Sequence, residues 1–304
     1  MEEQIIKPNS AKAWVLAARP KTLSGAAVPV MIGVALAYTD ARTFYEEGTF
    51  SWVAALLCLL FSFAMQIDAN FINDFFDFAN GADDAETRLG PRRACAMGWV
   101  KLDAMKKAIA ATTCLACVIG LPLAWFGGLE MIIVGALCVV FAFLYTTFFS
   151  YKGLGDVLVL VFFGIVPVCC CYYVQLHTIT WQVFLASLAC GLVIDALLIV
   201  NNFRDRDNDR EAGKNTIIVK LGAEAGLQLY MGVGIGAIIL GGTFWMNGHV
   251  LAFVFPFIYL LMHILTYLKI KRIYQGKALK LCLGETARNI FVYGLCVSIG
   301  LLLV

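Results

Sequence analysis

Long runs of apolar residues, separated by short polar stretches, form the main pattern of this chain. Backbone polar groups inside a bilayer must be satisfied within the segment, so runs of about 20 apolar residues predict membrane-spanning helices. The pattern predicts nine of them: Thr22–Tyr38, Ser51–Ile72, Ala104–Phe126, Met131–Phe149, Val157–Gln175, Trp181–Val200, Leu227–Trp245, Val250–Leu268 and Asn289–Val304. The stretch Ser10–Ala18 predicts a short helix at the membrane surface, ended by the Arg19-Pro20 step.

The composition supports a membrane protein. Hydrophobic residues make up 61% of the 304 positions and charged residues only 14%, against roughly 45–50% and 25% in soluble domains. These values exclude a soluble domain, a disordered tail and a secreted disulfide scaffold. The eleven cysteines are scattered and the three histidines are isolated, so we expect neither a disulfide framework nor a zinc site.

The basic residues are distributed unequally over the two sides of the nine predicted spans. Of the 23 Lys and Arg residues, 22 fall on the side of the N-terminus or at its border, and only Arg42 falls on the other. Short cytoplasmic loops collect Lys and Arg. We therefore expect a plasma (inner) membrane protein with a cytoplasmic N-terminus and its C-terminus on the opposite side.

Two acidic clusters stand at the inner ends of the second and sixth predicted spans. The first contains Asn70, Asn73, Asp74 and Asp77 and the second contains Asn201, Asp205 and Asp209; the shared Asn-x-x-x-Asp pattern recurs after 131 residues. Four spans lie between the copies, so both emerge on the same side, as in a parallel repeat of spans 1–4 and 5–8. Gln66, Asn70, Asn73 and Asp77 follow the spacing of one helix face, and Asn201, Asp205 and Asp209 do likewise. A shared polar site on the cytoplasmic side is therefore predicted.

The residue types of this site indicate its ligand. Carboxylate and amide oxygens without imidazole or thiolate partners favour Mg²⁺, with Mn²⁺ as an alternative, and Mg²⁺ commonly joins one or two carboxylates to substrate phosphates. Basic residues on the same side predict contacts to a diphosphate, although they also fit lipid headgroups. These are Arg19, Lys21, Arg88, Arg92, Lys152, Arg204 and Lys214. Asp68 and Asp195 are acids inside spans two and six, which either act in the chemistry or tie helices together.

The chain resembles the UbiA superfamily of intramembrane prenyltransferases, and most of all its 1,4-dihydroxy-2-naphthoate branch, which serves menaquinone synthesis. Asn73, Asp74 and Asp77 match the family motif NDxxDxxxD; Gly81 stands in place of its third Asp, and Asp83 follows two residues later. Asp205 and Asp209 match the second motif, DxxxD. The stretches at 19–23, 88–92 and 153–156 also look like that branch, so the resemblance covers nearly the whole chain.

The resemblance implies a fold, a reaction and roles for these residues. The fold would be all-α, one membrane-embedded domain over 1–304, with nine transmembrane helices around a central cavity. Segment 1–21 would be cytoplasmic or interfacial, and loops 73–103 and 201–226 would cap the site. The implied metal ligands are Asp74, Asp77, Asp83 (or Asp84), Asp205 and Asp209, with Asn70 and Asn73 in the same catalytic group.

The implied partners are a polyprenyl diphosphate, the aromatic acceptor dihydroxynaphthoate and membrane lipid, with no nucleic acid. The ring carbon bearing the carboxylate would attack the prenyl group and lose CO₂, giving demethylmenaquinone and diphosphate. Another UbiA-type acceptor, such as 4-hydroxybenzoate, is an alternative, and a divalent-cation transporter is a remote one. Prenyl chain length, the acceptor pocket and the oligomeric state are not set by the sequence pattern.

Overall fold

The computed structural model describes residues 6–81, 90, 92–149 and 152–303, and these residues form helices and turns without a strand among them. The elements are α1 (Ala11–Ala18), η1 (Pro20–Thr22), α2 (Leu23–Phe44), α3 (Trp52–Ala79), α4 (Leu102–Gly120), α5 (Leu123–Gly127), α6 (Glu130–Leu144), η2 (Tyr145–Phe149), α8 (Gly155–Val159), η3 (Leu160–Ile165), α9 (Val166–Leu176), α10 (Trp181–Glu211), α11 (Ile217–Leu221), α12 (Ala223–Met246), α13 (Val250–Val254), α14 (Pro256–Ile273) and α15 (Leu279–Leu302).

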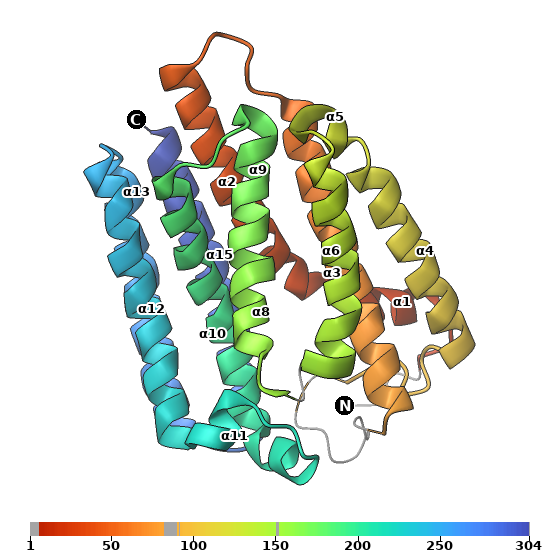
Figure 1. Ribbon diagram of the computed structural model, residues 1–304. Coiled ribbons are helices and arrows are strands. Elements are labelled where there is room, and N and C mark those ends of the chain that lie inside the picture. The colour runs from red at the N-terminus through yellow and green to blue at the C-terminus, as the bar shows by residue number, and fades with distance from the viewer. Residues whose placement is uncertain (1–5, 82–89, 91, 150–151, 304) are drawn as a thin grey trace.

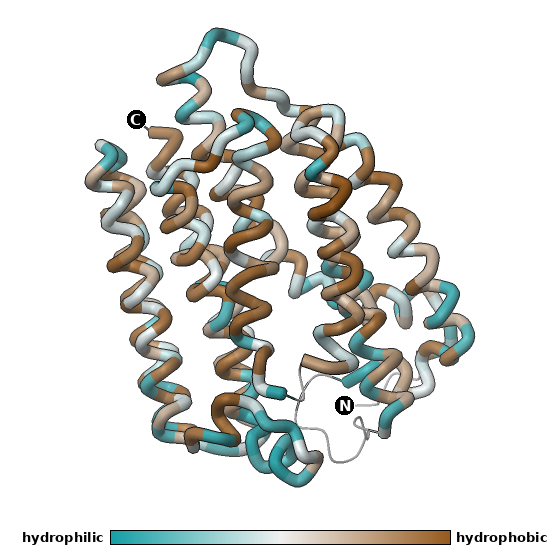
Figure 2. The backbone as a smooth tube through the Cα atoms, in the orientation of Figure 1, coloured by the Kyte–Doolittle hydropathy of each residue, from teal (hydrophilic) through white to brown (hydrophobic). Residues whose placement is uncertain are grey.

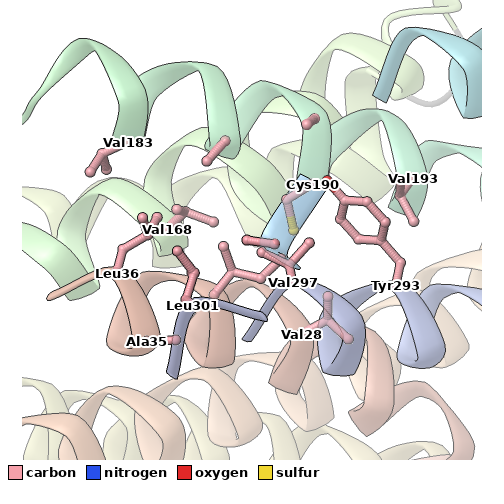
Figure 3. Packing of buried hydrophobic residues seen from close by; sticks show 14 of the residues in the cluster. Val28, Ala35, Leu36, Val168, Val183, Cys190, Val193, Tyr293, Val297 and Leu301 are labelled. Atoms are coloured by element: carbon pink, nitrogen blue, oxygen red, sulfur yellow. The ribbon is translucent and has the colours of Figure 1, made fainter. Parts of the chain in front are cut away.

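The long helices run side by side along one direction (Figure 1). α10 packs against α12, η3, α9 and α15, while α3 packs against α4 and α6; α2 and α9 contact both α3 and α10 and so join the two groups. The main core lies among α2, α9, α10 and α15, where Leu36, Val168, Val193 and Val297 interdigitate (Figure 3). This core fixes the direction of α10, which carries the second acid motif, while α3 packs in separate clusters with α4 and α6 and with α2 and α9.

The surface of the bundle is that of an integral membrane protein. Apolar residues cover the long middle part of the helices, and polar residues gather at their two ends (Figure 2). Large apolar side chains face outward along this middle part, including Ile133 on α6 and Ile239 on α12. Such a continuous apolar surface fits hydrocarbon and would be unfavourable in water.

The predicted count of nine spans is not confirmed. Among the described residues, eight helices are long and apolar enough to cross a bilayer. The expected ninth span lies in α15, which has 24 residues and packs against α2, α10 and α14. Its first ten residues include Lys280, Glu285 and Arg288, and these charges shorten its apolar part.

The predicted helix ends are also wrong at both acid motifs, because α3 continues to Ala79 and α10 to Glu211. The motifs therefore lie on the last turns of long helices, and the segments predicted as cap loops from 73 and 201 begin as helix. Hydropathy marks where a span leaves the hydrocarbon, whereas backbone hydrogen bonds continue the helix beyond that point. Both motifs lie at the same end of the bundle, opposite the C-terminus (Figure 1).

A close helix contact beside the core depends on two glycines. A Cβ atom added to Gly164 of η3 would lie 2.6 Å from the Cα of Gly191 and 2.6 Å from the carbonyl oxygen of Ser187, both on α10. Small residues of this kind allow membrane helices to approach closely.

We predict that Gly164→Ala destabilises the protein by about 1–3 kcal/mol, because the new methyl group meets backbone that cannot move aside. Gly232→Ala is the matched control, since a Cβ there has no atom within 4 Å, and it should change stability by less than about 0.5 kcal/mol. Unfolding of both purified variants in detergent measures the difference. Equal stabilities would contradict the close contact.

Candidate functional site

Asp74 is the most enclosed acid of the first motif. Its side chain is 0% exposed, and its two oxygens accept hydrogen bonds from the backbone N–H groups of Ala94 (2.9 Å) and Cys95 (3.0 Å). Arg19 Nη2 lies 3.9 Å from Asp74 Oδ2. Asp74 therefore fixes the segment after α3 against the helix end, in addition to any contact with a ligand.

Asp77, one turn further along α3, is paired with an arginine from the same segment. Arg93 Nη2 donates a hydrogen bond to Asp77 Oδ2 over 3.1 Å, and both side chains are buried. The Arg19 guanidinium also interacts electrostatically with Asp77. Arginines of the chain thus supply part of the positive charge beside these carboxylates, where the sequence predicts a metal ion.

Arg19 stands where the surface helix α1 turns into α2. As predicted, α1 ends at Ala18, and Arg19 adopts a left-handed conformation (φ 50°), which is unfavourable for a residue with a Cβ. Asn70 holds this turn, because its Nδ2 donates hydrogen bonds to the Ala18 carbonyl and to Thr22 Oγ1, both over 3.0 Å. Arg19 Nη2 is buried and has no hydrogen-bond partner among the described residues.

The Cys95 thiol is buried beside the Asp74 carboxylate, and both conditions raise its pKa. Burial raises the pKa of Cys95 to about 12, and the neighbouring Asp74 carboxylate adds to this effect. A thiol with that pKa is protonated at neutral pH. Cys95 is therefore a protonated, buried thiol that packs this segment against Asp74.

The second motif contains its own ion pair. Arg204 donates from Nε to Asp205 Oδ1 (2.7 Å) and from Nη2 to Asp205 Oδ2 (2.5 Å), and Nη2 also donates to Asn201 Oδ1 (2.8 Å). Arg204 is 1% exposed, and its Nη1 has no hydrogen-bond partner among the described residues. This bidentate geometry fixes the direction of the Asp205 carboxylate.

The remaining predicted residues lie at the same end of the bundle with different exposures. Asp209 and Lys214 are half-buried, and the Lys214 backbone N–H donates to the Asp209 carbonyl over 2.8 Å. Lys152 is exposed, with its Nζ 3.8 Å from the centre of the Phe148 ring. Lys21 and Arg92 are exposed and Asn73 is half-buried. Asp83, Asp84 and Arg88 lie outside the described residues.

Tyr145 links the two motif helices. Its side chain interacts electrostatically with Asp77 of α3, with Asp195 of α10 and with Asp156 of α8. Tyr145 therefore lies between the two helices that carry the acid motifs. The part of the chain that the structure describes contains no group of three or more Asp, Glu, His or Cys that could hold a metal by itself.

The sequence did not identify Tyr145, Asp156 or the direct partner of Asp77, Arg93, as site residues. An aromatic residue in an apolar span usually packs, so nothing in the sequence marks Tyr145. Asp68 has a structural role, since it accepts hydrogen bonds from Thr112 Oγ1 (2.5 Å) and Thr113 Oγ1 (2.8 Å) and so ties α3 to α4.

Comparisons with known proteins agree with this arrangement. The profile of the UbiA prenyltransferase family matches residues 26–293. The 1,4-dihydroxy-2-naphthoate octaprenyltransferase of Escherichia coli (strain K12) is 39% identical over 233 residues, covering 73% of this chain and 72% of that protein. The protein of the same name from Mycobacterium tuberculosis is 34% identical over 223 residues, covering 72% and 73%.

Solved structures share the fold. The apo structure of a UbiA homolog from Aeropyrum pernix K1 has a TM-score of 0.68 at 16% identity, covering 92% of this chain and 97% of that one. The structure of a UbiA homolog from Archaeoglobus fulgidus bound to DMAPP and Mg²⁺ has a TM-score of 0.62 at 15% identity, covering 94% and 99%.

We predict that Asn70→Leu loosens the Arg19 turn, because it removes the two hydrogen bonds that Asn70 donates there. Backbone amides of residues 18–22 should exchange with deuterium about tenfold faster, as expected for losing a hydrogen bond of about 1.4 kcal/mol. Gln66→Leu is the control, since it removes the 3.4 Å hydrogen bond from Gln66 to Asn70 Oδ1 and leaves both donors of Asn70 in place. Unchanged exchange in Asn70→Leu, measured by mass spectrometry in detergent, would contradict this role.

Proposed function

The chain belongs to the UbiA prenyltransferase family, and we propose that it transfers a polyprenyl group from a polyprenyl diphosphate to 1,4-dihydroxy-2-naphthoate in menaquinone synthesis. Relatives named 1,4-dihydroxy-2-naphthoate octaprenyltransferase, at 34–39% identity, support this substrate pair. Both acid motifs lie within residues 26–293, which the family profile matches. The proposal assigns these motifs, and the basic residues around them, to the donor substrate.

The observation that carries the proposal is the unused hydrogen-bonding capacity of buried guanidinium nitrogens of two arginines, the half-buried Arg19 and the buried Arg204. Arg19 Nη2 and Arg204 Nη1 have no hydrogen-bond partner among the described residues, and a buried charged donor left without an acceptor is costly. Each arginine belongs to one of the two acid motifs. Diphosphate oxygens would satisfy both, and the exposed Lys21, Arg92 and Lys152 with Lys214 would add charge at the entrance.

The donor set of the site fits a divalent cation. Asp77, Asp205 and Asp209 offer carboxylate oxygens, and Asp74 retains a second lone pair on each oxygen beyond its backbone hydrogen bonds. The described residues hold no cluster of three acids, and Mg²⁺ commonly binds through one or two carboxylates plus substrate phosphates. Mg²⁺, or Mn²⁺ in its place, would neutralise the charge that develops on the departing diphosphate. We expect Asn73 to face the same region and Asp83 to extend it.

The residues of the chain then have defined tasks in the transfer. Arg19 and Arg204 hold the diphosphate while the bond from its oxygen to the prenyl carbon breaks, and they stabilise the charge left on that oxygen. The ring carbon bearing the carboxylate forms the new bond to the prenyl carbon. That ring carbon then releases CO₂, and the electron pair of the broken bond returns to the ring. The apolar helix walls exclude water from the allylic cation.

The proposed placement puts the acid motifs on the cytoplasmic face of the inner membrane, together with the N-terminus, and the C-terminus on the opposite side. The excess of Lys and Arg at the motif end supports this direction. A soluble diphosphate product would then leave directly into the cytoplasm.

We predict that Asp77→Asn and Asp205→Asn each lower prenyl transfer by about 100-fold or more, because each removes a charge from the proposed cation site. Asp207→Asn is the matched control on the same helix, since Asp207 is engaged by Gln275 (3.0 Å) and lies near Arg210; its rate should stay within threefold. The rates are measured with purified protein, polyprenyl diphosphate and saturating Mg²⁺. Normal rates in the first two variants would refute the site.

The acceptor is tested separately. With a polyprenyl diphosphate supplied, dihydroxynaphthoate labelled at its carboxyl carbon should release one labelled CO₂ for each prenylated product. 4-Hydroxybenzoate should be prenylated at less than about a tenth of that rate, because its single ring makes fewer contacts than the two rings of dihydroxynaphthoate. Transfer to 4-hydroxybenzoate alone would change the acceptor. Flux of Mg²⁺ through proteoliposomes without any transfer would favour the transporter alternative.

A further inference from the structure

A second polar group lies inside the bundle, separate from the acid motifs. Asp195 of α10 is 6% exposed, and its Oδ1 has no hydrogen-bond partner among the described residues. Asp156, in the first turn of α8, is half-buried and also has an unpartnered Oδ1. The two carboxyl groups interact electrostatically. Two acids thus face one region with oxygen atoms that the protein does not use.

Tyr145 completes this group. A Cβ atom added to Gly155 would lie 3.8 Å from Tyr145 Oη and 3.3 Å from Leu198 Cδ2. Gly155 immediately precedes Asp156, and Leu198 follows Asp195 by three residues on the same helix. The tyrosine hydroxyl therefore lies at the junction of α8 and α10, where both acids are found, and it is half-buried and retains accessible surface.

Asp68 shows that these unused oxygens are not a general property of acids in this bundle. Asp68 too is the one acid in the apolar part of its helix, and it is 0% exposed. However, both its oxygens accept hydrogen bonds from threonine hydroxyls of α4. Where the fold uses an aspartate to join helices, it provides the donors. At Asp195 and Asp156 it leaves acceptors open.

The open acceptors need a ligand group that donates hydrogen bonds. The oxygens of a diphosphate accept hydrogen bonds and do not supply one. A phenolic hydroxyl is a neutral donor of the right kind. Building on the proposed function, we propose that Asp195, Asp156 and Tyr145 form the subsite that binds the hydroxyl groups of the aromatic acceptor.

The position of the subsite fits this task. Asp195 precedes Asp205 by ten residues on α10, which places it about 15 Å deeper in the bundle. Tyr145 also interacts with Asp77, so the subsite lies next to the end of the donor site. A hydroxyl that donates to a carboxyl oxygen makes its ring richer in electrons, including at the neighbouring carbon that bears the carboxylate. The subsite would thus both orient and activate the acceptor.

The test separates the two substrates kinetically. Asp195→Asn should raise the KM for dihydroxynaphthoate about 10- to 100-fold, the effect of weakening a hydrogen bond to an acid in a dry site, and leave the KM for polyprenyl diphosphate within twofold. Asp156→Asn and Tyr145→Phe should shift the same constant in the same direction. Asp68→Asn is the matched control: it should lower thermal stability and leave the ratio of the two KM values unchanged.

Three results would overturn the inference: an unchanged acceptor KM in Asp195→Asn, an equal rise of both KM values, or the same change of their ratio in Asp68→Asn. If Asp195→Asn does not fold, unchanged acceptor constants in both Asp156→Asn and Tyr145→Phe also overturn it. Failure of the proposed function is distinct, because it appears as a wild-type protein that does not prenylate dihydroxynaphthoate at all.

Discussion

The site depends on one constraint, which is that acids at buried helix ends must be compensated. Asp74 and Asp77 are enclosed at the end of α3, where uncompensated charge would cost several kcal/mol each. The chain compensates them with Arg19, Arg93 and two backbone N–H groups. These contacts draw α1 and the segment after α3 onto the helix end. The acids therefore build the walls of the site before any ligand binds.

The same compensation limits what the site can bind. Because Arg204 already pairs with Asp205 and Arg93 with Asp77, a bare cation would have to compete with these arginines for the carboxylates. A cation that arrives with a diphosphate does not meet this obstacle, since the phosphate oxygens can take up the arginine donors while the carboxylates turn to the metal. In the proposed function, metal and donor substrate would therefore bind together, with the arginines exchanging carboxylate oxygens for phosphate oxygens.

Much of the fold follows from the sequence, because apolar runs and the repeated Asn-x-x-x-Asp pattern are local signals. They predicted the bundle, the surface helix α1 and the placement of both motifs at one end. The predicted spans end before the helices do, because hydropathy marks only the part of a helix that lies in hydrocarbon. For the same reason, hydropathy does not settle whether α15, with its charged first turns, counts as a span. The sequence could not distinguish the roles of Asp68 and Asp195, since each is the one acid in the apolar part of its helix. Only Thr112 and Thr113, brought to Asp68 by the packing of α4, distinguish them.

The interior of the bundle then shows a division of charge that matches the two substrates. Exposed cations, among them Lys21 and Arg92, lie at the motif end of the bundle, while the deeper group of Asp195, Asp156 and Tyr145 offers acceptors for hydrogen bonds. An anionic donor substrate is favoured at the first place and disfavoured at the second, and the opposite holds for a hydroxyl group. In this proposal the donor diphosphate lies at the end of the bundle and the acceptor hydroxyls lie deeper, so the reactive carbon of the donor would face the acceptor ring. Tyr145, which interacts with acids of both groups, marks the boundary at which the new bond would form.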